Sequence, residues 1–230
     1  MNNNEVMKII SYTELANIEN VQVQKGMNFG IKKSYSIVLM STAKGAPYND
    51  KLLDDGVIEY EGHDANKSKD YDKKKVNQPL RRESGTLTEN GKFFKAAEEF
   101  KDKLRSAAKM KVYRKIKNGI WVDMGFYDLI DAAIESDGVR QVCKFLLKPN
   151  YEGVSKSDDF VDLEHNRMIP GDIQRQVYER DKGKCTKCGS SDNLHFDHIL
   201  PFSKGGSSKT ATNIQLLCAR HNLSKSDKFV

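Results

Sequence analysis

Cysteine is scarce in this 230-residue chain, and long apolar runs are absent. Four cysteines do not suggest the disulfide framework of a small secreted protein, so we expect a reducing compartment. No apolar run approaches the roughly 20 residues that a membrane-spanning helix needs. The first residues, Met-Asn-Asn-Asn-Glu, lack the basic start and apolar centre of a signal peptide. The sequence therefore predicts a soluble, cytoplasmic protein.

Acidic residues are outnumbered by basic ones, which gives a net charge of +6 and a pI near 9.0. The excess is uneven. Residues 168–230 contain ten basic and six acidic residues, whereas residues 1–167 contain 28 and 26. A basic surface favours a polyanionic partner such as nucleic acid, and the C-terminal part is its expected location.

The chain is long enough for two small domains. Glycine, serine and acidic residues gather in the stretch 150–169 and are typical of a linker. We therefore expect an N-terminal domain at 1–152, a linker at 153–168 and a C-terminal domain at 169–230. The N-terminal part is long enough for a core of its own.

The spacing of possible metal ligands is the sharpest signal in the chain. Cys185 and Cys188 are separated by two residues, and so are Cys218 and His221. Two such pairs match the spacing of a tetrahedral structural zinc site. A domain of about 60 residues buries little apolar surface, so bound zinc would supply part of its folding free energy. A purely structural zinc ribbon without catalysis is the alternative interpretation.

Between and after the ligand pairs lie Asp197, His198, Asn213 and Asn222. Phosphodiester hydrolysis needs an activated water and a stabilised leaving oxygen, tasks suited to a histidine and a hard divalent cation. The order of these residues resembles that of the HNH nucleases, which have a ββα-metal fold. The resemblance implies that His198 is the general base and that Asn213 braces the loop that orients it. It also implies that Asp197 and Asn222 hold the catalytic metal.

Two positions depart from the commonest pattern of that family. His221 stands where a fourth cysteine is usual, which zinc tolerates, and Asn222 stands where a histidine is frequent. An amide oxygen suits Mg²⁺ or Mn²⁺ better than a softer metal, so the sequence favours magnesium. Lys225 is expected to contact a DNA phosphate or to lie at a helix end.

A second resemblance covers residues 20–149. Short segments follow one another as in SRA domains, which flip 5-modified cytosines out of DNA; these segments are 34–39, 48–50, 55–62, 77–80, 125–128 and 143–148. The resemblance implies a twisted β-barrel or sheet with flanking helices. It places Tyr48 and Tyr60 as the rings that sandwich the flipped base, and Asp50 as the acid that selects cytosine, although Lys51 follows where the family has a second acid. The lysine-rich loop 63–79, with Lys67 and Lys69, would reach a DNA groove.

Plainer interpretations exist for these residues: the two tyrosines can be packing residues, and the loop can be a solvated surface insertion. Taken together, the two resemblances predict an α+β protein that acts as a modification-dependent restriction endonuclease of the kind bacteria use against phage DNA. Its partner would be double-stranded DNA carrying 5-methyl- or 5-hydroxymethylcytosine, with a homodimer as one route to double-strand cleavage. An HNH enzyme that reads unmodified sequence or structure, as in homing or repair, and a non-catalytic zinc-containing DNA-binding module remain open.

Sequence patterns also predict individual elements. A helix is expected within residues 5–19, and a second behind a capping box formed by Thr86 and Glu89. Strands are expected at 34–40, 57–60, 111–117, 120–124 and 139–148. A third helix should begin near Pro170, because proline suits a first helical turn.

Overall fold

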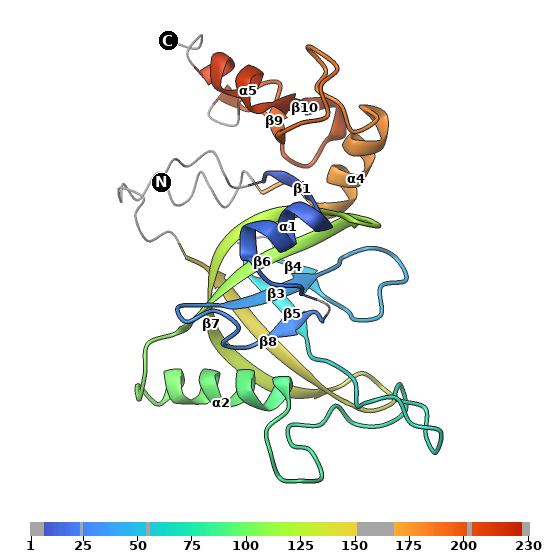
Figure 1. The fold of residues 1–230 in the computed structure, drawn as a ribbon, viewed down its shortest axis with the longest axis vertical. Helices are drawn as coiled ribbons and strands as arrows, with labels where there is room; N and C mark the ends of the chain where they lie inside the picture. The colour runs from blue at the N-terminus through green and yellow to red at the C-terminus, as the bar shows by residue number, and fades with distance from the viewer. Residues whose placement is uncertain (1–6, 24, 54–55, 151–167, 202–203, 227–230) are drawn as a thin grey trace.

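The structure is a computed structural model that describes residues 7–23, 25–53, 56–150, 168–201 and 204–226. It contains a large curved sheet from the N-terminal part of the chain and a small two-stranded unit from the C-terminal part (Figure 1). The mixture of strands and a few separate helices confirms the predicted α+β class. The expected linker at 153–168 lies outside the described residues, except for Met168.

The described residues form a sheet of eight strands in the order β2-β3-β6-β7-β8-β5-β4, with β1 paired to β7. The pair β3 and β6 is parallel, and the other pairs are antiparallel. The strands are β1 (Ile9–Ser11), β2 (Met27–Asn28), β3 (Ser36–Met40), β4 (Lys51–Leu52), β5 (Ile58–Glu61), β6 (Ala108–Lys117), β7 (Ile120–Ser136) and β8 (Gln141–Pro149). The register shifts where β7 pairs with β6 and β8, and such irregularities bend a sheet. The long strand β7 is visibly curved (Figure 1).

Two helices flank this sheet, and only the second begins differently from the prediction. Helix α1 spans Tyr12–Glu19 and is capped by Ser11, because residues Ile9–Ser11 pair with β7 instead of extending the helix. Helix α2 spans Glu89–Lys101, and its cap is Thr88, whose hydroxyl accepts a hydrogen bond from Gly91 N. The expected capping box of Thr86 and Glu89 is wrong: the Glu89 carboxylate instead accepts a hydrogen bond from the backbone N–H of Phe29.

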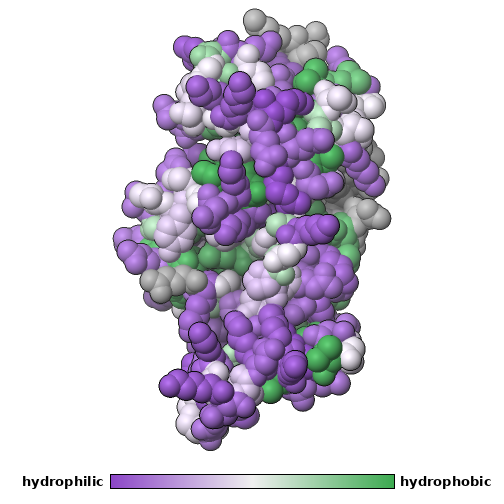
Figure 2. Space-filling model, turned by 90° about the vertical axis from the view of Figure 1, so that its right-hand side faces the viewer, coloured by the Kyte–Doolittle hydropathy of each residue, from purple (hydrophilic) through white to green (hydrophobic). Residues whose placement is uncertain are grey.

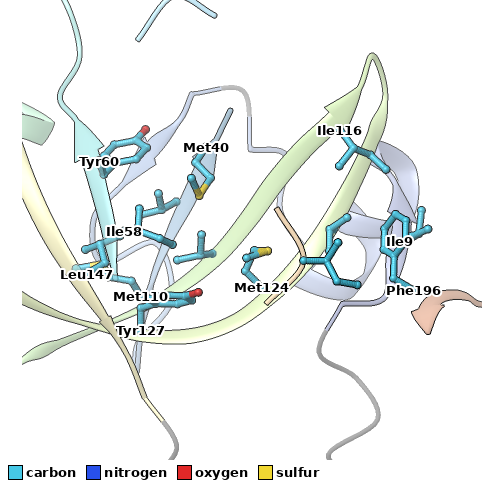
Figure 3. Packing of buried hydrophobic residues seen from close by; sticks show 14 of the residues in the cluster. Ile9, Met40, Ile58, Tyr60, Met110, Ile116, Met124, Tyr127, Leu147 and Phe196 are labelled. Carbon is cyan, nitrogen blue, oxygen red and sulfur yellow. The ribbon is translucent and has the colours of Figure 1, made fainter. Parts of the chain in front are cut away.

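The core of the N-terminal part lies between α2 and the concave sheet. Phe93 of α2 packs edge-to-face on Phe145 of β8 and on Phe29, with ring centroids 5.5 and 5.4 Å apart. Figure 3 shows Met40, Ile58, Tyr60, Met110, Tyr127 and Leu147 meeting in this core. Burial of these side chains is the main stabilising contribution of the N-terminal part.

The C-terminal part is a helix followed by a ββα unit. It consists of α4 (Gly171–Arg180), β9 (Leu194–His198), the short 3-10 helix η2 (Ala211–Asn213), β10 (Ile214–Cys218) and α5 (Ala219–Ser226). Strands β9 and β10 form an antiparallel pair. Pro170 is the N-cap of α4, close to its predicted place in the first turn. Arg180 donates to the carbonyl oxygens of Ala211 and Ile214, which ties α4 to the start of β10.

The two parts meet in a continuous apolar contact. Ile9 of β1 and Phe196 of β9 belong to one buried cluster and lie near each other in Figure 3. Lys8 forms a β-bridge with His195. The fully buried Arg114 of β6 donates to Ile169 O at 2.7 Å, just before α4. The two parts therefore share one continuous buried cluster.

The surface seen in Figure 2 is mainly hydrophilic, with only small separate apolar areas. Within the described part of the chain, helices that combine the length and the apolar character needed to cross a bilayer are absent.

Candidate functional site: a metal-supported ββα unit and an aromatic-lined cavity

Four ligand atoms converge at one end of the ββα unit. The sulfurs of Cys185, Cys188 and Cys218 and a ring nitrogen of His221 all lie within 4.8 Å of one another. Nδ1 of His221 is 3.4 Å from the sulfurs of both Cys185 and Cys218, and the sulfurs of Cys188 and Cys218 are 3.8 Å apart. A tetrahedral zinc ion with bonds of about 2.3 Å to sulfur implies S···S edges of about 3.8 Å and S···N edges of about 3.5 Å. The donor set therefore fits zinc.

The local backbone explains why these ligands converge. A tight turn after α4 presents the first pair, with Gly189 N donating to Cys185 O at 2.8 Å and Cys185 N donating to Ser190 O at 2.7 Å. Cys218 ends β10 and His221 lies in the first turn of α5, so the second pair spans a strand-to-helix junction. The ligands thus connect the segment after α4 to the β10–α5 corner.

Asp197 and His198 stand at the end of β9, next to the zinc cluster in sequence but with different partners. Nε2 of His198 is 2.8 Å from Oγ of Ser208. Oδ2 of Asp197 accepts hydrogen bonds from Nζ of Lys225 at 2.7 Å and from Nε2 of Gln215 at 2.8 Å. Gln215 faces Asp197 directly across the β9–β10 pair. The acid and the histidine therefore have separate environments, as their proposed roles require.

Asn213 connects the two ends of the loop between β9 and β10. Its Oδ1 accepts from Leu200 N at 2.9 Å, and its Nδ2 donates to the carbonyl oxygens of Leu200 and Ser207, both at 3.1 Å. The loop closes tightly, because a Cβ on Gly206 would lie 1.9 Å from Leu200 O and 2.8 Å from Nδ2 of Asn213. Ser208, the partner of His198, directly follows this braced segment.

Asn222 and Lys225 both belong to α5, which packs against β9 and β10. Lys225 was predicted to contact a DNA phosphate or to lie at a helix end, and it lies in the last turn of α5, where its ammonium donates to Asp197 and to His198 O. A cation is thus already held at the carboxylate that we predicted to bind a metal. Asp197 and the half-buried Asn222 offer oxygen donors of the type that Mg²⁺ and Mn²⁺ prefer.

The sheet carries a large cavity at the predicted base-binding residues. Its volume is about 1320 Å³, and Tyr48, Asp50 and Tyr60 all line it. A second cavity of about 720 Å³ is also lined by Tyr48, so this residue belongs to the wall of both. Basic residues from four separate segments line the larger cavity; they are Lys25, Lys44, Lys73, Arg81, Arg82, Lys115 and Lys117. Such a lining suits a phosphate backbone.

The two tyrosines have unequal roles in this cavity. Tyr60 is only 1% exposed, and its hydroxyl donates to Leu39 O at 3.3 Å. Tyr48 is partly exposed, and the imidazole of His63 stacks on its ring, with centroids 5.0 Å apart and planes inclined by 14°. Nε2 of His63 is also 3.3 Å from the Tyr60 hydroxyl. The side chain that stacks on Tyr48 is therefore the imidazole of His63.

Asp50 is a buried acid whose two oxygens are engaged by the backbone. Oδ2 accepts from Ser41 N at 2.9 Å, and Oδ1 accepts from Glu61 N at 3.1 Å. Burial raises the pKa of the Asp50 carboxyl to about 7, although both hydrogen bonds act in the opposite direction. Asp50 thus joins the residue after β3 to the end of β5.

Lys67 and Lys69 lie in a loop without helix or strand, as predicted for residues 63–79, and both are exposed. A later lysine of this loop, Lys74, contacts other side chains. Lys74 lies 3.0 Å from Asp64 and 4.5 Å from the centre of the Tyr48 ring. Asp64 also pairs with Arg140 at 2.7 Å, and both side chains are 2% exposed. The base of the loop is therefore anchored by buried ion pairs.

Three residues of these sites were missed in the sequence. His63 follows Tyr60 by three residues in a polar loop, and its spacing gives no stacking signal. Ser208 lies in a serine-rich turn, where it has no distinguishing neighbour. Gln215 could have been found, because pairing β9 with β10 places it directly opposite Asp197.

A comparison with protein families supplies the decisive observation for the C-terminal part. Residues 185–228 match the HNH endonuclease family. The HNH resemblance predicted from the sequence is thereby confirmed, and the match spans both zinc ligand pairs, Asp197, His198, Asn213 and Asn222. Residues 185–228 are called the HNH unit below.

Solved structures similar to the chain come from SRA proteins. The SRA domain of SUVH5 with hemimethylated CG DNA has a TM-score of 0.45 and 19% identity, and the match covers 66% of this chain and 93% of that one. The same domain with fully hydroxymethylated CG DNA has a TM-score of 0.44, 19% identity and coverages of 64% and 89%. SUVH6 of Arabidopsis thaliana has a TM-score of 0.42, 18% identity and coverages of 70% and 28%. A search of curated proteins returned no match.

Proposed function

We propose that the protein is a modification-dependent DNA endonuclease. In this proposal the N-terminal part binds a 5-modified cytosine flipped out of double-stranded DNA, and the HNH unit hydrolyses the backbone nearby. The observation that carries it is the presence, in one chain, of an HNH unit and of a basic cavity with a partly exposed aromatic ring, Tyr48. Base-flipping proteins need such a ring, because a flipped base loses its stacking partners in the duplex.

In the HNH unit, His198 accepts the proton of the attacking water through a ring nitrogen. Ser208 fixes the orientation of that ring through its contact with Nε2. Asp197 and Asn222 hold Mg²⁺ or Mn²⁺, which when bound stabilises the negative charge of the leaving oxygen. Asn213 keeps the loop closed through Leu200 and Ser207, so that the histidine and Ser208 stay together. The zinc cluster holds α5 against the strands and takes no part in the chemistry.

In the N-terminal part, the flipped cytosine stacks on Tyr48, and Tyr60 supports the floor of the cavity. The Asp50 carboxylate accepts from the exocyclic amine of cytosine, which thymine lacks. A 5-methyl group adds only about 0.8 kcal/mol of apolar burial, or roughly a fourfold preference. Strong discrimination therefore needs a further contribution from the cavity. Lys67 and Lys69 contact the DNA backbone from the exposed loop.

Two other functions are compatible with an HNH unit. An HNH enzyme that reads unmodified sequence or structure would cut unmodified DNA equally well. A DNA-binding module in which zinc is structural would bind DNA but never cut it. The aromatic and basic lining of the larger cavity favours the modification reader over both.

Digestion of four matched duplexes tests the proposal. They contain cytosine, 5-methylcytosine, 5-hydroxymethylcytosine or glucosylated hydroxymethylcytosine at the same positions, and each is incubated with and without magnesium. We expect magnesium-dependent cleavage of at least one modified duplex and little cleavage of the unmodified one. Equal cleavage of all four would support the unmodified-DNA enzyme, and binding without cleavage would support the structural module. The His198→Ala protein is the matched control for contaminating nucleases.

A further inference from the structure

The cavity in the sheet already contains an aromatic ring where the flipped base is proposed to stack. His63 lies parallel to Tyr48, with ring centroids 5.0 Å apart, and its Nε2 is 3.3 Å from the Tyr60 hydroxyl. The same imidazole therefore contacts both residues that the sequence assigned to the base sandwich. Burial lowers the pKa of His63 to about 4, so the ring is uncharged at neutral pH. An uncharged planar ring on Tyr48 resembles a stacked pyrimidine in its contacts.

The main chain of His63 is fixed independently of its ring. His63 N donates to Oδ1 of Asn90 at 2.8 Å, and Nδ2 of Asn90 donates back to His63 O at 2.8 Å. Asn90 is 2% exposed and lies in the first turn of α2. These bonds use only backbone atoms of residue 63, so they persist with any side chain there. Movement of the imidazole is therefore a side-chain rotation that leaves the loop in place.

The Nε2 edge of the His63 ring is closely packed. A Cβ on Gly26 would lie 2.7 Å from Nε2 of His63 and 2.6 Å from the Tyr60 hydroxyl, so only glycine leaves room for this contact. His63 itself lines the cavity of about 1320 Å³. The Nε2 edge of the imidazole thus packs closely against Gly26 and the Tyr60 hydroxyl, and His63 also borders the cavity.

The second neighbour of the Tyr48 ring is held much more firmly. Lys74 lies 4.5 Å from the ring centre, lines the smaller cavity and pairs with Asp64 at 3.0 Å. Asp64 in turn pairs with the buried Arg140. Displacing Lys74 would break its ion pair with the buried Asp64, whereas displacing His63 breaks one stacking contact and one hydrogen bond between neutral groups. A ring arriving at Tyr48 therefore meets less resistance from His63.

We infer that His63 is a plug that occupies the place of the flipped base on Tyr48 and must rotate away before a modified cytosine can stack there. This inference rests on the proposed function. The plug sets a threshold, because every base has to replace the contacts that His63 makes with Tyr48 and Tyr60. A base with additional contacts from its 5-substituent passes this threshold more readily than plain cytosine. His63 thus lowers the flipped fraction of every base by the same factor, so plain cytosine, which has the fewest contacts in the cavity, stays in the duplex.

Binding without added magnesium separates the possible roles of His63. The full chain is titrated with matched duplexes that carry cytosine or a modified cytosine, and a fluorescent base analogue at the same position reports flipping. We expect His63→Ala to bind the modified duplex about three- to tenfold more tightly than the wild type and to raise the flipped fraction in the unmodified duplex. His63→Phe keeps a ring on Tyr48, so it should show no such gain. Thermal melting checks that both variants are folded.

The Tyr48→Ala variant distinguishes failure of the His63 plug from failure of the proposed reader function. If Tyr48→Ala loses affinity for modified DNA while His63→Ala also loses affinity or binds as the wild type does, the reader function stands and the plug is refuted. If neither the wild type nor any variant prefers modified DNA, the reader function fails and the plug fails with it. A gain in His63→Phe equal to that in His63→Ala would also refute the plug, because the effect would then not depend on an empty place on Tyr48.

Discussion

The ammonium of Lys225 lies 2.7 Å from Oδ2 of Asp197, the carboxylate that we propose as a ligand of the catalytic metal. The two side chains are only 19% and 13% exposed, so water screens their attraction weakly. Lys225 therefore neutralises the charge of Asp197. A divalent cation that binds this carboxylate competes with the lysine.

This competition predicts the behaviour of Lys225→Ala. Hydrogen bonds between charged groups contribute about 1.5–3 kcal/mol, so their removal should lower the half-saturating magnesium concentration about tenfold or more. The measurement is the cleavage rate as a function of magnesium concentration. Lys225→Arg, which keeps the positive charge, is the control and should retain most of the wild-type requirement. An unchanged or higher magnesium requirement in Lys225→Ala would contradict the competition.

Replacement of His198 should separate cutting from binding. His198→Ala should lower the cleavage rate by about 10²–10⁴, because general-base catalysis acts on the transition state. Affinity for modified DNA should change little, since the base cavity lies in the other part of the chain. Ser208→Ala removes only the orienting contact and should cause a smaller loss of rate. The comparison needs single-turnover cleavage and a binding titration, and a wild-type rate in His198→Ala would remove this residue from the base role.

Substitution of single cysteines tests the proposed zinc site, with Cys143 as the control. Metal analysis of the purified protein should find one zinc per chain, and Cys185→Ser or Cys218→Ser should lose it. Cys143 is buried in β8, away from the cluster, and Cys143→Ala should keep the zinc. Chelation should unfold the HNH unit, because structural zinc supplies folding free energy to small domains. A metal-free protein with an unchanged melting profile would exclude a structural zinc.

Two titratable groups in the base cavity should change the free energy of unfolding in opposite directions as pH rises. The pKa of Asp50 rises from 3.8 to about 7, mainly through burial, so between these values the folded protein binds more protons than the unfolded chain. Its contribution therefore falls as pH rises. The pKa of His63 falls from 6.5 to about 4, again mainly through burial, so its contribution rises with pH over that range. Each group can change the free energy of unfolding by at most roughly 1.4 kcal/mol per pH unit.

Single substitutions should expose each contribution. We expect His63→Ala to lose stability relative to the wild type as pH increases from about 4 to 6.5, and Asp50→Asn to gain stability relative to it. Urea unfolding across this pH range measures both differences. Charged groups near the two residues are present in all three proteins; they are Lys25, Glu61, Asp64, Lys73, Glu89 and Lys144. Equal pH profiles for the three proteins would contradict the assigned shifts.

The sequence by itself determined the zinc ligands and the order of the candidate catalytic residues. Each ligand pair is separated by two residues, so a single turn or a strand-to-helix corner brings the pair together whatever the rest of the fold does. The same local character explains why five of the ten described strands and the start of α4 were predicted. Hydrophobic periodicity and capping act within a few residues along the chain.

Only the tertiary structure decided which groups touch across long separations. Asp197 and Lys225 are 28 residues apart, and they meet because α5 packs on the β9–β10 pair. Tyr60 was predicted as a base-stacking ring, and its packing beside Leu39, His63 and Gly26 leaves it 1% exposed. The place on Tyr48 is taken by His63, whose position depends on Asn90 of α2 and on the missing side chain at Gly26. Such contacts depend on the register of the sheet and the packing of whole elements, which local sequence patterns do not encode.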